Sequence, residues 1–459
     1  MSRGGHMKVI YQIGRFERGG FNPLKFEING KVYQSYLSSL ALRQHFKDAG
    51  SQAKVILIYP VSILLNRPAL SSEGMTEDFR NLVQGLLMES SKLEDYLRNP
   101  YPYFAEHPHS KEADSFIVIH SIGQYEGVSF LATLEELILE TFVGIVSHYH
   151  QEPFSELYLD VSSGHNIYTT ALLEAGRLFL ICYNLQNPHV KDEEKLKVYI
   201  TFSEPIVQPF DRIFKVFTGF PLEVKTFFSF PQAPDQYSFD GAYMKFSQQL
   251  TGEDRKMKRF FNELFARGYF FYSALKNNTP LVLYSWDYDQ EDIIDEGIRK
   301  LTELIKTKLR QHYRTTPGLS LDPYRKGFIM LSLYKGIVKI LKDNAIVKKE
   351  EVSVYEIKEK FCRQDMSIYN YFDLQQNSSY LSHEIDVNFE KNKERFSDEW
   401  KLLKDYMNVY ETQSFNDRNF LAHCGFERNC ILVKKVNADV VIKYDENLRN
   451  YIERCLLRK

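Results

Sequence analysis

The first half of the chain alternates between short apolar runs and longer stretches in which apolar residues recur at helical spacing. Apolar runs of this kind are typical of strands buried on both faces, and strands that alternate with helices form a parallel sheet between two helical layers. We therefore predict an α/β fold with a parallel sheet for this half. The five expected strands are Lys8–Ile13, Ala53–Tyr59, Ser115–His120, Glu156–Val161 and Lys197–Phe202. Helices are expected at 76–97, 131–146 and 167–183, a loop at 99–110 and a further edge strand at 224–230.

Three loops that follow these strands contain glycine or serine and are expected at one edge of the sheet. In open parallel sheets, ligands bind at the carboxyl ends of the strands, near the point where the strand order reverses. Hydroxyls, glycine and free N–H groups at a helix start can hold a phosphate or a ribose, although the same residues also make ordinary turns. Because three loops converge, we predict a ligand site at this edge. We expect His165 to form a hydrogen bond with a base or a ribose of the ligand. The expected residues of the site are Gly14, Arg15, Ser121, Gly123, Ser162, Ser163, Gly164, His165 and Asn166.

The second half changes character after Pro234, where charged, helical stretches replace the apolar runs. We predict an α/β domain at 7–235, a helical connector at 236–290 and a mainly helical domain at 291–459. Residues 1–6 are interpreted as a cloning leader. The expected helices are 240–249, 252–275, 291–314, 323–343, 392–411 and 445–457, and a small hairpin is expected from strands 431–436 and 440–444.

A short segment near the C-terminus combines groups suited to breaking a phosphodiester. His423 is the only one of the 12 histidines with an arginine, Arg418, five to seven residues before it, and Asn419 lies between them. Histidine can act as a general base or acid, and arginine is always charged and matches phosphate geometry. Asn416 or Ser414 is a plausible N-cap, and Gly425 is a plausible C′ residue that ends a helix here. The alternative is that the pair lies on an ordinary surface or in a satisfied core.

Other features narrow the possible functions. The formal net charge is −2, so any nucleic-acid site must be a local patch. Five cysteines without CxxC pairing argue for a reducing compartment, and the absence of a long apolar run predicts a soluble, cytoplasmic chain without a membrane span. The pairs His107/His109 and His148/His150 lack supporting carboxylates or cysteines, so we expect no metal and place them in a surface loop and at a helix end.

Arg418-Asn419-x-x-x-His423 resembles the signature of HEPN ribonucleases, in which an arginine and a polar residue precede a histidine. The Ser162–Asn166 loop after the fourth strand is similar to the ligand loop of CARF, the CRISPR-associated Rossmann fold. Together they resemble the CARF–HEPN ancillary ribonucleases of type III CRISPR systems, the Csx/Csm group. Gly14 and Arg15 match the first-strand loop of the sensor, whereas the match at Ser121 and Gly123 is weaker because those loops vary.

This resemblance implies a Rossmann-like sensor domain and a helical HEPN domain, joined in a homodimer that can assemble further. A cyclic oligoadenylate, with cyclic tetra-adenylate as the first expectation, would bind across the two-fold axis. Binding would activate metal-independent, non-specific cleavage of single-stranded RNA at Arg418, Asn419 and His423, leaving a 2′,3′-cyclic phosphate, and no other cofactor is implied. One alternative is a nucleotide-sensing protein whose helical half recruits a partner or nucleic acid without catalysis. Another is a sensor that also degrades its own ligand.

Overall fold

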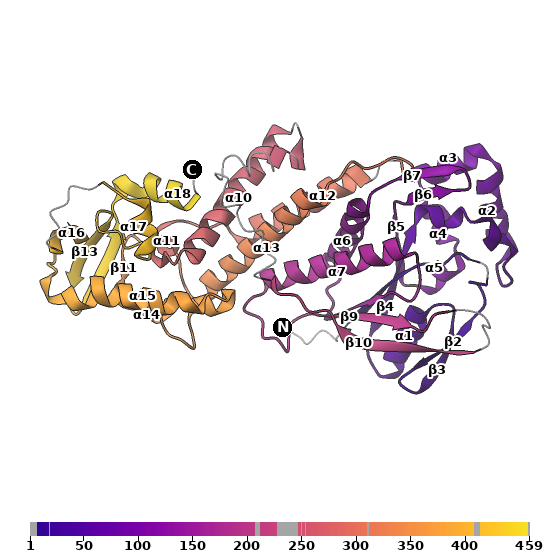
Figure 1. Cartoon of the computed structure of the whole chain (residues 1–459), viewed down its shortest axis with the longest axis horizontal. Helices are drawn as coiled ribbons and strands as arrows, with labels where there is room; N and C mark the ends of the chain where they lie inside the picture. Colours follow the sequence, from indigo (N-terminus) through magenta and orange to yellow (C-terminus); the bar gives the residue numbers. More distant parts are fainter. Residues whose placement is uncertain are drawn as a thin grey trace. The chain divides into compact units, whose positions relative to one another are not determined.

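The computed structural model describes residues 7–17, 19–206, 212–226, 247–248, 250–252, 254–309, 312–407 and 414–457. The chain divides into two compact units, neither of which is continuous in sequence (Figure 1). The first comprises Met1–Ile181, Asp192–Val224 and Thr302–Asp322, and the second Cys182–Lys191, Lys225–Leu301 and Pro323–Lys459. Four features predicted from sequence lie wholly or largely outside the described residues, namely the leader, the edge strand at 224–230, the boundary at 235 and the helix at 240–249.

The first unit is built on an eight-stranded sheet with the order β3-β2-β10-β9-β8-β1-β4-β5. Its five predicted strands are confirmed as β1 (Lys8–Ile13), β4 (Ala53–Pro60), β5 (Ser115–Ile119), β8 (Glu156–Asp160) and β9 (Lys197–Ser203). All neighbouring pairs among these five are parallel, as in β1 with β4 and β1 with β8. The strand order reverses at β1, because β4 and β5 follow on one side and β8 and β9 on the other. The loops after β1 and β8 therefore flank the topological switch point.

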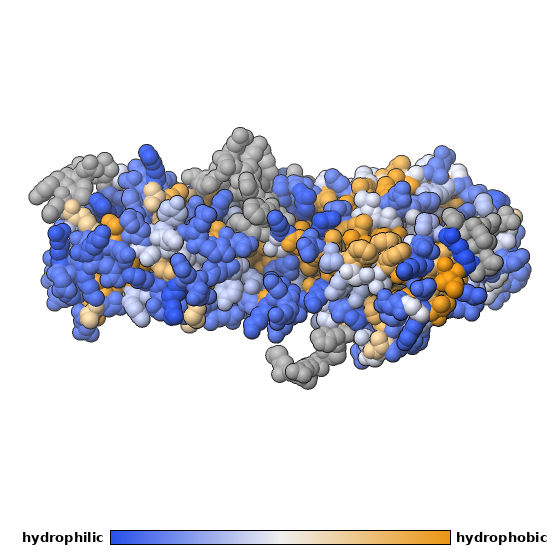
Figure 2. All heavy atoms as spheres, turned by 60° about the horizontal axis from the view of Figure 1, so that its bottom comes forward, coloured by the Kyte–Doolittle hydropathy of each residue, from blue (hydrophilic) through white to orange (hydrophobic). Residues whose placement is uncertain are grey.

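Three further strands extend this sheet and were not predicted. The hairpin of β2 (Leu24–Ile28) and β3 (Lys31–Ser35) forms one edge, and β10 (Ile213–Pro221) pairs antiparallel with β9. β10 exposes two large hydrophobic residues, Ile213 and Phe220. Figure 2 shows hydrophobic side chains gathered on the surface of the unit that contains the eight-stranded sheet, at the right of the view. The sheet is therefore mixed, with a parallel centre.

Helices cover both faces of the parallel centre. On one face, alternate residues of β4, such as Val55 and Leu57, share a core with Leu42 of α1 (Ser38–Asp48) and Phe79 of α2 (Glu77–Met88). On the other face, α6 (Leu134–Gln151) and α7 (Asn166–Gln186) approach β5 and β8 through glycines. A Cβ on Gly144 of α6 would lie 2.8 Å from Ile117, and one on Gly176 of α7 would lie 2.4 Å from Leu159. Successive side chains of each strand point to opposite faces of the sheet, and helices bury both faces, as the apolar runs predict.

Four helices of the first unit differ in place or number from the sequence prediction. The stretch expected as one helix at 76–97 is split into α2 and α3 (Ser90–Arg98). The stretch 99–110, expected as a loop, instead contains α4 (Tyr101–Ala105) and the start of α5 (Pro108–Glu112).

A segment from the middle of the helical half completes the first unit. His312 Nε2 lies 3.1 Å from Glu94, and the Tyr313 ring stacks on His120 with centroids 4.6 Å apart. Glu136 accepts hydrogen bonds from Thr316 Oγ1 (2.9 Å) and from the main-chain N–H of residue 319 (3.0 Å). Residues 302–322 are therefore fastened to the α/β unit although their sequence neighbours belong to the other unit.

The second unit is mainly helical and carries a small antiparallel sheet. Its principal helices are α10 (Arg255–Lys276), most of α12 (Glu291–Leu309) and α13 (Leu321–Asp343), α14 (Val354–Phe361), α15 (Gln375–Asn388) and α18 (Arg449–Leu457). The predicted hairpin is confirmed as β13 (Ile431–Val436) and β14 (Asp439–Tyr444), flanked by the two-residue strands β11 (Val352–Ser353) and β12 (Lys401–Leu402). Among the described residues, no helix combines the length and hydrophobicity that a membrane span requires.

The single helix expected at 392–411 is wrong, because the described part of that range is broken by a strand and keeps only the end of a 3₁₀ helix and the four-residue helix α16 (Leu403–Tyr406). A 3₁₀ helix ends at Arg395, and β12 pairs with β13 through Lys401 opposite Val433. The main-chain N–H of Lys435 also donates to the carbonyl of Ser397 (2.7 Å), so the edge of the hairpin forms main-chain hydrogen bonds with this segment. Pairing with a distant strand overrides the local helical propensity.

Candidate ligand and catalytic sites

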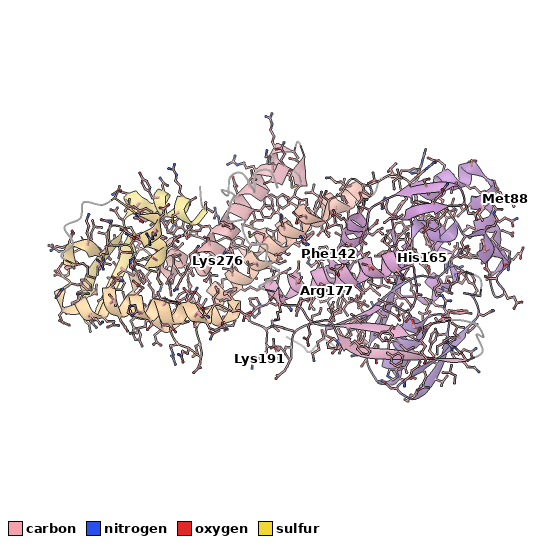
Figure 3. All side chains as sticks on the ribbon, in the orientation of Figure 1. Met88, Phe142, His165, Arg177, Lys191 and Lys276 are labelled. Atoms are coloured by element: carbon pink, nitrogen blue, oxygen red, sulfur yellow. The ribbon has the colours of Figure 1, made fainter. Side chains whose placement is uncertain are left out.

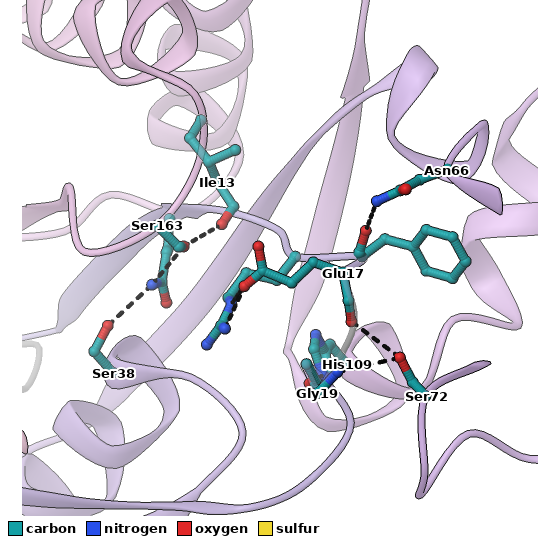
Figure 4. A network of polar contacts seen from close by, with 12 residues as sticks. Ile13, Glu17, Gly19, Ser38, Asn66, Ser72, His109 and Ser163 are labelled. Carbon is teal, nitrogen blue, oxygen red and sulfur yellow. Dashed lines mark hydrogen bonds and ion pairs between the residues drawn. The ribbon is translucent and has the colours of Figure 1, made fainter. Parts of the chain in front are cut away.

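The loop after β8 is fastened to the end of β1 by Ser163 (Figure 4). Its Oγ donates to the main-chain oxygen of Ile13 (2.7 Å) and accepts from Gln12 Nε2 (2.9 Å). Gly164 follows with a φ of +103°, and a Cβ there would lie 2.7 Å from Cβ of Ile13. Glycine is required because the backbone conformation and the close approach both exclude a side chain. The loop therefore crosses tightly over β1 and leaves Gly164 and the next two residues exposed at the sheet edge.

Asp160, the last residue of β8, is a fully buried carboxylate below this loop. It accepts hydrogen bonds from Ser38 Oγ (2.8 Å) and from the main-chain N–H of Ser162 (2.9 Å). Burial raises the pKa of Asp160 to about 6, while the hydrogen bonds from Ser162 and Ser38 act in the opposite direction. The Ser162 hydroxyl accepts from the main-chain N–H of Ser203 (2.7 Å). The hydroxyls of Ser162 and Ser163 are therefore already engaged within the protein, where they shape the loop.

A cavity of 470 Å³ opens at this edge of the sheet. Four of the residues predicted for the ligand site line it: Gly14, Arg15, Gly164 and His165. His165 lies at the N-terminal end of α7, where the loop from β8 ends (Figure 3). The cavity thus lies at the topological switch point, where ligands bind in folds of this type.

The other predicted ligand residues do not line this cavity. Ser121 is fully buried, and its Oγ accepts from the main-chain N–H of Ser62 (2.9 Å). Gly123 belongs to β6 (Ile122–Tyr125), which forms a hairpin with β7 (Val128–Leu131). Asn166 is exposed at the first position of α7.

Sequence reasoning missed several residues that line the cavity. Tyr125 and Glu126 come from the β6–β7 hairpin, Tyr168 from the first turn of α7, Asn66 from the segment after β4, and Glu17 from the loop after β1. A signal for the hairpin was present, because Glu126 is followed by a glycine and the turn is flanked by strand-forming residues.

His107 and His109 lie beneath the first-strand loop, and the expectation of a surface loop was wrong for them. Both are fully buried, and their rings lie 5.6 Å and 5.4 Å from the ring of Phe21. Burial and the neighbouring guanidinium of Arg15 lower the pKa of His109 to about 3, and burial together with His109 lowers that of His107. Both imidazoles are therefore neutral near pH 7. His148, by contrast, lies in the last turn of α6 as expected.

The candidate catalytic segment forms the short helix α17 (Asp417–Ala422). The Asn416 side chain caps it by accepting from the main-chain N–H of Asn419 (3.0 Å), as predicted. Phe420 is fully buried and anchors the helix against Phe415 and Tyr444, at ring distances of 5.5 Å and 6.1 Å. One buried aromatic residue and one cap thus hold a helix that is otherwise largely exposed.

Arg418 is exposed on this helix and makes no ion pair with any residue that the structure describes. His423 is the C-cap residue, with 47% of its side chain exposed, and its Nδ1 lies 3.1 Å from Glu384 Oε2 on α15. Cys424 and Gly425 follow with φ values of 55° and 79°, so the chain turns sharply after the histidine. Arg418 is therefore helical whereas His423 lies outside the helix, which ends at Ala422. Glu384 is a contact that the sequence motif gave no reason to expect.

This arrangement supplies a fixed cation, a titratable imidazole and a carboxylate that holds the imidazole. A base oriented by a third group is the usual arrangement for proton transfer. Asn419, which lies between Arg418 and His423 in sequence, is half-buried, and its main-chain carbonyl accepts from the main-chain N–H of His423 (3.0 Å). Within the described ranges, no cluster of three or more histidine, cysteine or carboxylate side chains is placed to hold a metal ion.

Comparison with protein families identifies a domain for each half of the chain. Residues 8–205 match the CARF domain of CRISPR system endoribonuclease Csx1, and residues 374–446 match the HEPN domain of the same endoribonuclease. The first match includes β1 and the loop after β8, and the second includes Glu384, Arg418 and His423. No curated protein matches the chain.

The fold and the two family matches thus define a nucleotide-sensing Rossmann-like domain combined with a helical ribonuclease domain. The chain belongs to the CARF–HEPN ribonucleases of CRISPR systems, and the resemblance read from the sequence is confirmed.

Proposed function

We propose that the protein is an endoribonuclease that cyclic oligoadenylate, in the first place cyclic tetra-adenylate, switches on. In this proposal it cuts single-stranded RNA without sequence preference or a metal ion, as part of type III CRISPR antiviral defence. The observation that carries the proposal is the pairing of His423 with Glu384 at 3.1 Å, close to the exposed Arg418 on α17. A purely structural helix gains nothing from an exposed arginine and an oriented, half-exposed imidazole.

Cleavage proceeds by attack of the 2′-hydroxyl on the adjacent phosphorus. A bond forms between the 2′-oxygen and phosphorus, the bond from phosphorus to the 5′-oxygen breaks, and the products are a 2′,3′-cyclic phosphate and a 5′-hydroxyl. The attacking hydroxyl gives its proton to a base, and the leaving oxygen takes one from an acid. Arg418 stabilises the charge that develops on the phosphate oxygens, and Asn419 donates to the phosphate or orients the imidazole.

One imidazole cannot be base and acid in the same step, which favours a homodimer. Two copies of α17 about a two-fold axis supply two histidines and two arginines. A cyclic oligonucleotide has matching rotational symmetry, so it suits a site made from two copies of the cavity at Gly14, Arg15, Gly164 and His165. Ligand binding and cleavage would then both require the same dimer.

Purified protein, tested with RNA and EDTA, provides the decisive experiment. We expect cleavage only when cyclic tetra-adenylate is added, and we expect His423→Ala to abolish cleavage while ligand binding survives. Equal cleavage by wild type and His423→Ala would remove the catalytic assignment. Ligand binding by a wild-type protein that cuts no RNA would favour a sensor that acts by recruitment instead.

Glu384 acts in this scheme as a positioning residue for His423. We expect Glu384→Gln, which keeps a hydrogen-bond acceptor, to lower kcat about tenfold and to leave KM unchanged, since orientation affects the proton-transfer step. Glu384→Ala should lower kcat further. A change confined to KM, or an equal loss in both variants, would contradict the positioning role.

A further inference from the structure

The ligand cavity contains two carboxylates, although its proposed ligand is a polyanion. Glu17 and Glu126 both line it, and each forms an ion pair with an arginine. Arg15 Nε lies 2.7 Å from Glu17 Oε1, and Arg15 Nη2 contacts the same oxygen. Arg67 Nε lies 3.1 Å from Glu126 Oε2. Of the two arginines only Arg15 lines the cavity, so a phosphate that enters it meets a guanidinium group that a carboxylate already holds.

The Arg15–Glu17 pair joins a fixed cation to a movable anion. The Arg15 side chain is 7% exposed, whereas that of Glu17 is 54% exposed. Glu17 can rotate into water at little desolvation cost, but Arg15 would have to break its packing to leave. The pair formed by Arg67 and Glu126 has the opposite distribution, with an exposure of 54% for the arginine and 28% for the glutamate.

Arg15 is also incompletely satisfied. Its Nη1 is buried and has no hydrogen-bond partner in the part of the chain that the structure describes. Glu17 contacts the guanidinium of Arg15 through a single oxygen, Oε1, so the pair lacks the two parallel N–H···O bonds of a bidentate arrangement. The nearby imidazoles of His107 and His109 are neutral, so they add no positive charge. A buried guanidinium with a spare donor is suited to an acceptor that has several oxygens in a fixed geometry, as a phosphate has.

We propose that Glu17 is a built-in competitor for the ligand: it occupies Arg15 in the free protein, and a ligand phosphate must displace it. Glu17 therefore sets the ligand concentration at which the sensor fills, and it selects ligands that place a phosphate at Arg15. The inference rests on the proposed function for the identity of the ligand, but the exchange applies to any phosphate that enters the cavity. A contrasting role, in which Glu17 orients Arg15 for the ligand, predicts the opposite effect of its removal.

The test measures binding to the full-length protein by calorimetry. The probes are cyclic tri-, tetra- and hexa-adenylate and inorganic phosphate, and the variants are Glu17→Gln, Glu17→Ala, Arg15→Gln and Glu106→Gln. Glu106 makes a matched control because its side chain is 56% exposed, close to the 54% of Glu17, and it forms an ion pair with Lys111 but does not line the cavity. Its replacement changes the net charge equally. Melting temperatures report whether each variant folds.

We expect both Glu17 variants to lower the Kd of the tightest-binding probe about threefold to tenfold, since removing one nearby like charge has an effect of this order. Glu106→Gln should leave Kd unchanged, and Arg15→Gln should abolish binding. The ligand concentration for half-maximal RNA cleavage should shift with Kd. Suppose that wild type binds none of the cyclic oligoadenylates while Glu17→Gln binds phosphate more tightly than wild type does. In that case the proposed ligand is wrong, but the displacement of Glu17 from Arg15 by a phosphate is supported. Unchanged or weaker binding of every probe by the Glu17 variants would overturn the exchange.

Discussion

The ligand loop and the catalytic helix treat their polar side chains in opposite ways. Around the loop after β8, Asp160 is fully buried and Ser163 makes two hydrogen bonds within the protein. On α17, Arg418 is exposed without an ion pair among the described residues, and His423 keeps one partner, Glu384. The loop after β8 has its serine hydroxyls and its buried carboxylate engaged within the protein, whereas α17 leaves its reactive groups available.

The ligand loop is therefore preorganised for binding, whereas the side chains of the catalytic helix are available to substrate. A loop whose hydrogen bonds are already made loses little conformational entropy when a ligand arrives, which favours binding. An unpaired arginine and a half-exposed imidazole contribute little to folding but can contact substrate directly. Substitutions near the loop should therefore change stability, and substitutions on α17 should change activity. The following predictions test this contrast, from the largest expected effect to the smallest.

Replacing His423 should have the largest effect, and it should fall on activity alone. We expect His423→Ala to lower the rate of RNA cleavage by about 10²–10⁴-fold, because it removes the group that transfers the proton. Thermal unfolding should be nearly unchanged, since the side chain is half-exposed. His189→Ala, at another exposed histidine, serves as the control. A large drop in melting temperature would show that His423 is a structural residue.

Asp160 should make stability depend on pH. Its pKa is about 6 in the folded protein, above the usual value of 3.8. The folded state therefore binds the proton more tightly, so the contribution of Asp160 is fully present below pH 4 and is lost as the pH rises through 6. Relative to Asp160→Asn, the free energy of unfolding of wild type should fall by at most about 3 kcal/mol between pH 4 and pH 7. Urea unfolding at several pH values measures this; parallel curves for the two proteins would contradict it.

Two glycines with nearly the same backbone conformation should respond differently to alanine. Gly164 and Gly123 have φ values of 103° and 104°, but a Cβ would lie 2.7 Å from Ile13 at the first and 3.6 Å from Tyr125 at the second. Both substitutions incur backbone strain, and only Gly164→Ala adds an overlap. We expect Gly164→Ala to be more destabilising by about 1–3 kcal/mol and to weaken ligand binding. Equal stability of the two variants would show that the loop over β1 can move without cost.

The smallest effect is expected at the cap of α17. Asn416→Ala removes the acceptor for the main-chain N–H of Asn419 and should cost about 1 kcal/mol of stability. Because Arg418 and His423 are carried by this helix, kcat should fall several-fold as well. Asn416→Asp keeps the acceptor and should restore both quantities. Retention of full activity by Asn416→Ala would mean that substrate, not the cap, holds the helix in place.

Much of the fold followed from local patterns. Apolar runs located the five parallel strands, because burial on both faces demands continuous hydrophobicity. Asn416 located the start of α17, because capping is a local interaction, whereas the left-handed position after the C-cap falls on Cys424, one residue before the expected Gly425. Features that depend on distant partners were missed, such as β12, where pairing with β13 replaced the expected helix. His107 and His109 were misplaced for a related reason, since the side chains that bury them come from other elements.

The sequence by itself determined the five parallel strands, the loops after β1 and β8 and the Arg418–His423 motif, because each of these is encoded within a few neighbouring positions. Only the tertiary structure decided that residues 302–322 complete the first unit and that Glu384 contacts His423. It also decided that Arg15 lies buried under an exposed Glu17. Exposure and long-range contacts arise from how separate elements pack, and local spacing carries no record of that packing.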